Sequence, residues 1–173
     1  EAALNLNKGR LDDSISKYFT LLFHVAFPFL FICIFLAPSS FDVVFSEQWS
    51  EAGVIVQILA PWLFITFIAA PLSTIPTIYY KQELEFKFNI FLLIGRILTL
   101  YIGVYYDNLF LALGLYSFSN TIIWMIFLRY MIKLSNVKIK KIFLSCMDNK
   151  YEYLITACIV ICIYLFVNNS LYV

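Results

Sequence analysis

The sequence predicts an all-α membrane protein, a polytopic helix bundle with about five transmembrane helices. Hydrophobic residues make up 62% of the 173 residues and charged residues 13%, whereas soluble proteins average about 45–50% and about 25%. The mean hydropathy is +0.86. The apolar residues also form long runs, each close to the roughly 20 residues that a bilayer-crossing helix needs. We therefore expect the chain to contact the lipid bilayer and no nucleic acid.

The chain begins with a polar stretch and a first apolar run. Residues 1–17 are predicted to be a polar cytoplasmic lead-in with some helical character. The run Tyr18–Ala37 follows and contains His24 and Pro28. A proline inside a membrane helix removes a backbone hydrogen bond, so we expect a kink there. His24 could titrate in a cavity or bond a neighbouring helix near the interface, and we favour the second role.

The second apolar run, Val54–Tyr80, is longer than a bilayer requires. It follows an acidic loop, residues 38–53, that has no lysine or arginine. We expect one helix over this run, with tilt, kinks or an interfacial first turn taking up the extra length. Kinks are expected because the run contains three prolines, Pro61, Pro71 and Pro76.

The third run, Phe88–Tyr106, has a single arginine, Arg96, near its middle. This arginine lies about 12 Å along the helix from the start of the run, beyond easy reach of water. A guanidinium at that depth costs at least about 2.5 kcal/mol, so we expect it to face protein or a water-filled cavity. At helical spacing, its face of the helix also carries three polar or small residues, Asn89, Thr99 and Gly103.

The remaining runs complete the predicted bundle. Asp107 is expected to cap the tight turn before the fourth run, Leu109–Leu128. Four transmembrane helices are thus predicted within residues 18–132, and a basic cytoplasmic segment, residues 133–152, follows them. Residues 153–173 are predicted to be the fifth transmembrane helix, although their apolar part alone is short for a span.

The positive charges alternate from one connection to the next. Of the 12 lysines and arginines, three precede the first run, two follow the second and six follow the fourth, and Arg96 is the twelfth. The connections after the first and third runs have none. This positive-inside pattern places the N-terminus and residues 129–152 in the cytoplasm and the acidic loop 38–53 on the opposite side.

Histidine and cysteine usage argues against a metal or redox site. The chain has one histidine and four cysteines, and no two cysteines form a CxxC pair. Metal chemistry usually needs several imidazoles, thiolates or carboxylates together, so we expect no metal and no cofactor. We interpret the cysteines as unpaired structural residues of apolar helices: Cys33, Cys146, Cys158 and Cys162.

Several short motifs give the chain a resemblance to a transporter family. Their order and spacing over residues 2–132 are similar to those in the C-terminal part of bacterial O-antigen and capsular polysaccharide flippases, members of the multidrug, oligosaccharidyl-lipid and polysaccharide exporter superfamily. The likeness weakens beyond residue 132. It is carried by an arginine near the centre of the third run and by Lys8–Arg10, Gln48-Trp49, Ala52-Gly53, Ala60-Pro61-Trp62, Pro71-Leu72-Ser73 and Lys81-Gln82.

This resemblance implies a two-lobed transporter that opens alternately to the two sides of the bacterial inner membrane. The implied cargo is an undecaprenyl-diphosphate-linked oligosaccharide, flipped outward for O-antigen, capsule or exopolysaccharide assembly and driven by an ion gradient. The chain would then be no enzyme, and its partners would be the lipid-linked cargo and the remaining helices of the same transporter. Because it opens without a methionine or a signal peptide, we expect it to be a piece of a longer protein.

Arg96 is the main candidate site residue. A cavity arginine offers bidentate donors to a diphosphate or an acidic sugar. Asn89 and Thr99 share the face of Arg96 and could bond sugar hydroxyls, although we favour hydrogen bonds between helices as their use. The structural alternative is that Arg96 pairs with a carboxylate or with helix-end carbonyls of another span and fixes helix packing.

Two other classes of function remain open from the sequence. A membrane-embedded glycan polymerase or acyltransferase would act on similar lipid-linked material, but the short outer loops offer few acid, base or nucleophile groups. A non-catalytic membrane scaffold subunit would have the face around Arg96 buried dry against a partner helix, whereas a transporter would have that face reachable from water.

Overall fold

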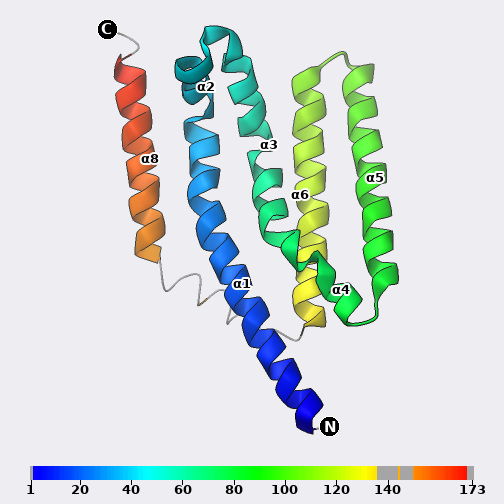
Figure 1. Ribbon diagram of the computed structural model, residues 1–173. Coiled ribbons are helices and arrows are strands. Elements are labelled where there is room, and N and C mark those ends of the chain that lie inside the picture. Colours follow the sequence, from blue (N-terminus) through cyan, green and yellow to red (C-terminus); the bar gives the residue numbers. More distant parts are fainter. Residues whose placement is uncertain (1, 136–143, 145–149, 171–173) are drawn as a thin grey trace.

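The computed structural model describes residues 2–135, 144 and 150–170, and every regular element in these ranges is helical (Figure 1). Most of the predicted basic segment 133–152 and the last residues of the predicted fifth helix therefore lie outside the described residues. The elements in chain order are α1 (Ala2–Phe35), α2 (Ala37–Phe45), η1 (Glu47–Trp49), α3 (Ser50–Ala69), η2 (Pro71–Thr74), α4 (Ile75–Ile78), α5 (Gln82–Tyr105), α6 (Leu109–Leu134) and α8 (Lys150–Ser170).

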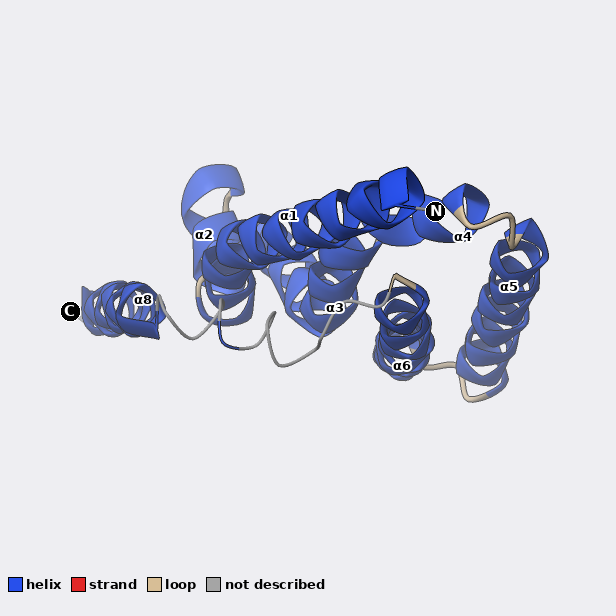
Figure 2. Ribbon diagram, turned by 90° about the horizontal axis from the view of Figure 1, so that it is seen from below, coloured by secondary structure: helices blue, strands red, loops and turns tan. Residues whose placement is uncertain are grey.

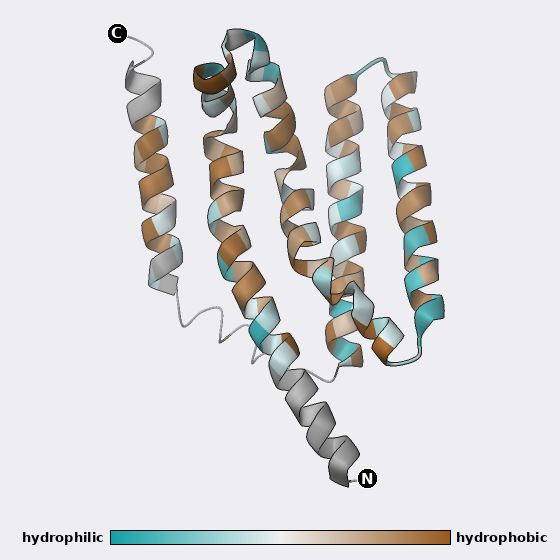
Figure 3. Ribbon diagram, viewed as in Figure 1, coloured by the Kyte–Doolittle hydropathy of each residue, from teal (hydrophilic) through white to brown (hydrophobic). Residues whose placement is uncertain are grey.

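Four helical segments in the described part of the chain are long and apolar enough to cross a bilayer: Ser14–Phe35, Ser50–Ala69, Gln82–Tyr105 and Leu109–Leu134. A shorter apolar stretch, Tyr153–Leu165, lies in α8. Figure 3 shows hydrophobic residues along these helices and hydrophilic ones at the start of α5. The predicted class, an all-α multi-pass membrane protein, is confirmed. The predicted polar lead-in is not a separate element, because α1 runs without a break from Ala2 through Pro28.

The long helices stand side by side in an open row (Figures 1 and 2). α5 packs against α6, α6 against α3, α3 against α1, and α1 against α8. The short α4 contacts α5 and α6 at the end of the molecule where α5 begins. The tightest core lies where α3 meets α6, and there Ile68, Ala69 and Met131 are almost fully buried.

The second predicted run is divided into several elements. Whereas we expected one helix over Val54–Tyr80, α3 ends at Ala69 and is followed by η2 and α4. Pro71 and Pro76 lack the N–H that a regular helix needs, and each lies in the first turn of a new element, Pro71 in the 3-10 helix η2 and Pro76 in the short α-helix α4. The expectation of a single helix is therefore wrong, although Pro61 is accommodated inside α3.

The predicted acidic loop 38–53 is largely helical and is held by an unusual hydrogen bond. In a continuous helix, the carbonyl of Ile34 would accept a bond from the N–H of residue 38, but Pro38 has none. The Nε2 atom of Gln57 on α3 donates to that carbonyl instead. Next to it, a Cβ atom on Gly53 would lie 2.7 Å from the nitrogen of Pro38, so α3 approaches α2 closely because Gly53 has no side chain.

A tight turn joins α5 to α6. Asp107 adopts a left-handed conformation with φ of 48°, and the Oδ1 atom of Asn108 accepts a hydrogen bond from the N–H of Leu111 at 2.9 Å. The side-chain cap of α6 is therefore Asn108, whereas Asp107, which we expected to cap the turn, occupies its left-handed position. Near the turn, a Cβ atom on Gly103 would come within 2.8 Å of the Cα atom of Ala112, so the two helices are in close contact there.

Candidate functional site

Arg96 is half-buried on α5 and directed at α6. Its Nε atom donates a hydrogen bond to the Oδ1 atom of Asn120 at 3.3 Å. Its Cζ atom also lies 6.0 Å from the centre of the Tyr116 ring, which is within the range of a cation–π contact. α6 therefore supplies both an amide and an aromatic face to the guanidinium.

Asn120 is fully buried and its two amide atoms have different partners. The Nδ2 atom donates to the carbonyl of Tyr116 at 2.8 Å within α6. This bond orients the amide so that Oδ1 is free to accept from Arg96. The Tyr116 ring in turn packs edge-on against Trp62 of α3, with ring centroids 5.1 Å apart. The surroundings of Arg96 thus involve three neighbouring helices of the row.

The partners of Arg96 are electrically neutral. Among the described residues, no carboxylate forms an ion pair with it and its Nη atoms donate no hydrogen bond. The Nε1 atom of Trp62, whose ring packs against Tyr116, is buried without a hydrogen-bond partner among the described residues. The positive charge is therefore held in place but not neutralised, and the guanidinium edge retains donors for an anion.

The structure does not bring Asn89 and Thr99 to the guanidinium. Asn89 is exposed and its Nδ2 atom donates to the carbonyl of Glu85 at 3.0 Å. Thr99 is buried, and its hydroxyl lies 2.9 Å and 3.1 Å from the carbonyls of Gly95 and Arg96. Both side chains thus bond to their own helix, Asn89 on the open face that it shares with Arg96 and Thr99 at the contact with α6.

The sequence interpretation missed Asn120 and Tyr116 as partners of Arg96. The available signal was the partly polar face of the fourth run, which includes Ser117, Asn120 and Thr121. Ser117 is buried there as well, and Thr121 donates to its carbonyl at 2.6 Å. An apolar helix with a polar face, next in the chain to a helix with a central arginine, is the pattern that would have indicated a contact between the arginine and that face.

The other candidates from the sequence lie away from Arg96. The His24 ring is 5.2 Å from the ring of Tyr153 on α8, and its Nδ1 atom is bonded to the carbonyl of Thr20 within α1. No group of three or more potential metal-ligating side chains occurs among the described residues. Cys33, Cys158 and Cys162 are free thiols, whereas Cys146 lies outside the described residues.

Comparison with known proteins does not extend this description. No family model matches the chain, and neither a curated protein nor a solved structure is significantly similar to it.

Proposed function

We propose that the chain forms part of a flippase that moves an undecaprenyl-diphosphate-linked oligosaccharide across the bacterial inner membrane. The observation that carries this proposal is the charge of Arg96, which is held on a membrane-spanning helix by the neutral side chains of Asn120 and Tyr116. A charge that was present only to fix helix packing would be expected to pair with a carboxylate or with helix-end carbonyls of another span. The resemblance of residues 2–132 to polysaccharide flippases supplies the class of cargo.

The geometry supports a role in holding an anion during its passage. A diphosphate loses its hydration in the low-dielectric middle of the bilayer, and guanidinium donors can replace part of that hydration. Asn120 binds the Nε atom and so leaves the Nη atoms for the cargo. Asn89, which is exposed on the same face, is positioned to bond a sugar hydroxyl, whereas Thr99 is assigned to helix packing.

The open row of helices is consistent with one part of a larger transporter. Large side chains along α5 are exposed, including Ile97 and Leu98. In the proposed protein, lipid covers some of this surface and the remaining helices of two lobes cover the rest. The lobes enclose a cavity that opens alternately to each side, driven by an ion gradient. The N-terminus and residues 129–152 are cytoplasmic on the positive-inside rule.

The proposal is tested by replacing Arg96 with lysine and with alanine in the full-length protein. Flipping of the lipid-linked oligosaccharide is then measured at equal membrane abundance. We expect alanine to abolish most transport, and lysine to restore only part of it because it lacks the planar bidentate fork. Undiminished transport in both variants would exclude a substrate role for Arg96.

A scaffold subunit is the second candidate, and the Arg96–Asn120 bond favours it because this bond ties α5 to α6. The two functions differ in whether water reaches the face of Arg96. A cysteine at Asn89 reports on that face without disturbing the core, since Asn89 is exposed, whereas Thr99 and Gly103 are buried against α6. In a variant lacking the native cysteines, labelling of Asn89→Cys by a membrane-impermeant thiol reagent supports the transporter, and full protection supports the scaffold.

A further inference from the structure

A groove runs between α5 and α6 on the flank away from Arg96. Its volume is about 440 Å³ and its walls are almost entirely Leu, Ile and Phe side chains. Phe91 of α5 and Ile126 of α6 line it and are each 65% exposed. The polar side chains that line it are those of Lys87 and Tyr130. The groove is therefore open and hydrocarbon-like, with one cation and one hydroxyl.

The groove is separate from the candidate site. Lys87 and Arg96 are nine residues apart on α5, which corresponds to about 180° of rotation around a helix. Between the two flanks, the ring of Phe88 stacks on that of Phe127 with centroids 3.8 Å apart and closes the contact between the helices. A ligand of the groove thus binds independently of a cargo at Arg96.

The cations lie at one end of the groove. α5 and α6 are antiparallel, so Lys87 near the start of α5 and Lys133 in the last turn of α6 lie toward the same end of the molecule (Figure 1). Lys133 follows Tyr130 by three residues, which places it on the same flank and nearer the helix end. Both lysines are exposed. Glu83 precedes Lys87 by one turn but forms no ion pair with it among the described residues.

We propose that this groove binds an anionic phospholipid of the surrounding bilayer. One acyl chain lies along the apolar walls, and the phosphate lies near the ammonium groups of Lys87 and Lys133. Lysine side chains near helix ends extend toward the headgroup level, where tyrosine is also favoured. Basic pockets between transmembrane helices are the usual binding sites of anionic headgroups. Because this end of the groove is positively charged, it should bind an anionic lipid in preference to a zwitterionic one.

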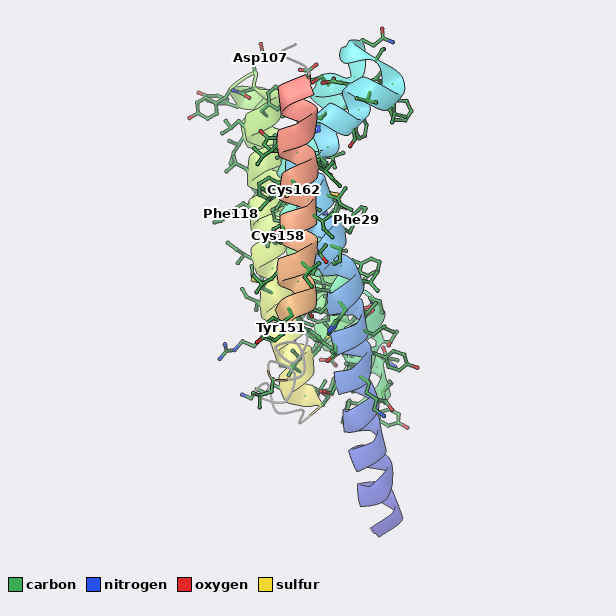
Figure 4. All side chains as sticks on the ribbon, turned by 90° about the vertical axis from the view of Figure 1, so that its left-hand side faces the viewer. Phe29, Asp107, Phe118, Tyr151, Cys158 and Cys162 are labelled. Atoms are coloured by element: carbon green, nitrogen blue, oxygen red, sulfur yellow. The ribbon has the colours of Figure 1, made fainter. Side chains whose placement is uncertain are left out.

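The molecule contains a natural control for this proposal. A second groove, between α1 and α3, has a similar volume of about 490 Å³, and its lining residues include no charged side chain. Phe29 lines it and is 57% exposed. Its position on α1 is labelled in Figure 4. This groove should accept acyl chains without regard to headgroup charge.

The test uses tryptophan fluorescence and lipids with brominated chains, which quench a tryptophan that they contact. Phe91→Trp and Phe29→Trp are made separately in the full-length protein. The fluorescence of the native tryptophans is measured on the unsubstituted protein and is subtracted from that of each variant. Each variant is placed in vesicles of phosphatidylcholine with increasing amounts of phosphatidylglycerol, and the bromine is carried by one lipid or the other. Both positions are exposed, so the larger ring does not enter the core.

We expect the Phe91→Trp variant to be quenched preferentially by brominated phosphatidylglycerol, with a preference of about fivefold for each lysine that contacts the phosphate. Lys87→Gln and Lys133→Gln should together bring the preference close to one, and Glu83→Gln should raise it. The Phe29→Trp variant should show no preference. An equal response of the Phe91→Trp variant to the two lipids overturns the proposal. So does protection of the Phe91→Trp variant from both lipids while the Phe29→Trp variant is quenched, because another protein segment would then cover the groove.

Discussion

The Oδ1 atom of Asn120 on α6 accepts a hydrogen bond from the Nε atom of Arg96 on α5, at 3.3 Å. The amide belongs to a fully buried side chain, while the guanidinium is half-buried. The bond therefore combines two properties: it stabilises the contact between the helices, and it fixes the orientation of a charge whose remaining donors are unused among the described residues. The first property can be measured apart from transport.

Replacing Asn120 with leucine should lower the free energy of unfolding by about 1–2 kcal/mol, because the guanidinium loses its partner in a partly buried place. Unfolding in mixed detergent micelles measures this change. Asn89→Leu is the matched control: its amide is exposed and bonds only within α5, so a change below about 0.5 kcal/mol is expected. Equal effects of the two substitutions would contradict the role given to the Arg96–Asn120 bond.

Gly103→Ala should separate α5 from α6 at their closest approach. The added Cβ would lie within 2.8 Å of the Cα atom of Ala112, whereas a Cβ at Gly114 would have nothing within 4 Å. We expect Gly103→Ala to destabilise the protein by about 1–3 kcal/mol because the core is overpacked, and Gly114→Ala to have almost no effect. Thermal unfolding of the two variants side by side checks this, and a harmless Gly103→Ala would show that the contact is loose.

Gln57→Leu should cost about 1–3 kcal/mol, because the carbonyl of Ile34 then has no donor. Pro38→Ala supplies a backbone N–H to the same carbonyl. In that background, Gln57→Leu should cost clearly less, and a double-mutant cycle measures the difference. Additive effects of the two substitutions would mean that Gln57 does not compensate for the proline.

Asn108→Ala should destabilise the start of α6 by about 1 kcal/mol through loss of the side-chain cap. Asn108→Ser should retain most of the stability, since a serine hydroxyl can accept the same bond. Hydrogen exchange of the amide of Leu111 reports on the cap directly and should become faster in Asn108→Ala alone.

The helical class of the protein could be predicted because it depends on the length of apolar runs, which is a local property of the sequence. The end of α3 at Ala69 could not, because a proline in an apolar run is compatible with either a kink or a break. Whether the helix kinks or breaks depends on the packing of η2 and α4 against α6.

The partner of Arg96 could not be predicted for a different physical reason. Asn120 lies 24 residues away in the chain, and its contact depends on how α6 is rotated about its own axis. That rotation is determined by the interhelical packing, including the close contact of Gly103 with Ala112. The periodicity placed Thr99 on the face of Arg96, but the structure shows that its side chain is buried and that its hydroxyl is bonded to carbonyls of its own helix.

The tight turn between α5 and α6 also bears on how the protein is made. Because only a few residues connect these helices, they can enter the bilayer as one hairpin during synthesis. Arg96 and Asn120 lie at comparable distances from the turn, so the arginine has its amide partner within reach at the moment of insertion. The energetic penalty of bringing a guanidinium into lipid is thereby reduced before any other helix has arrived.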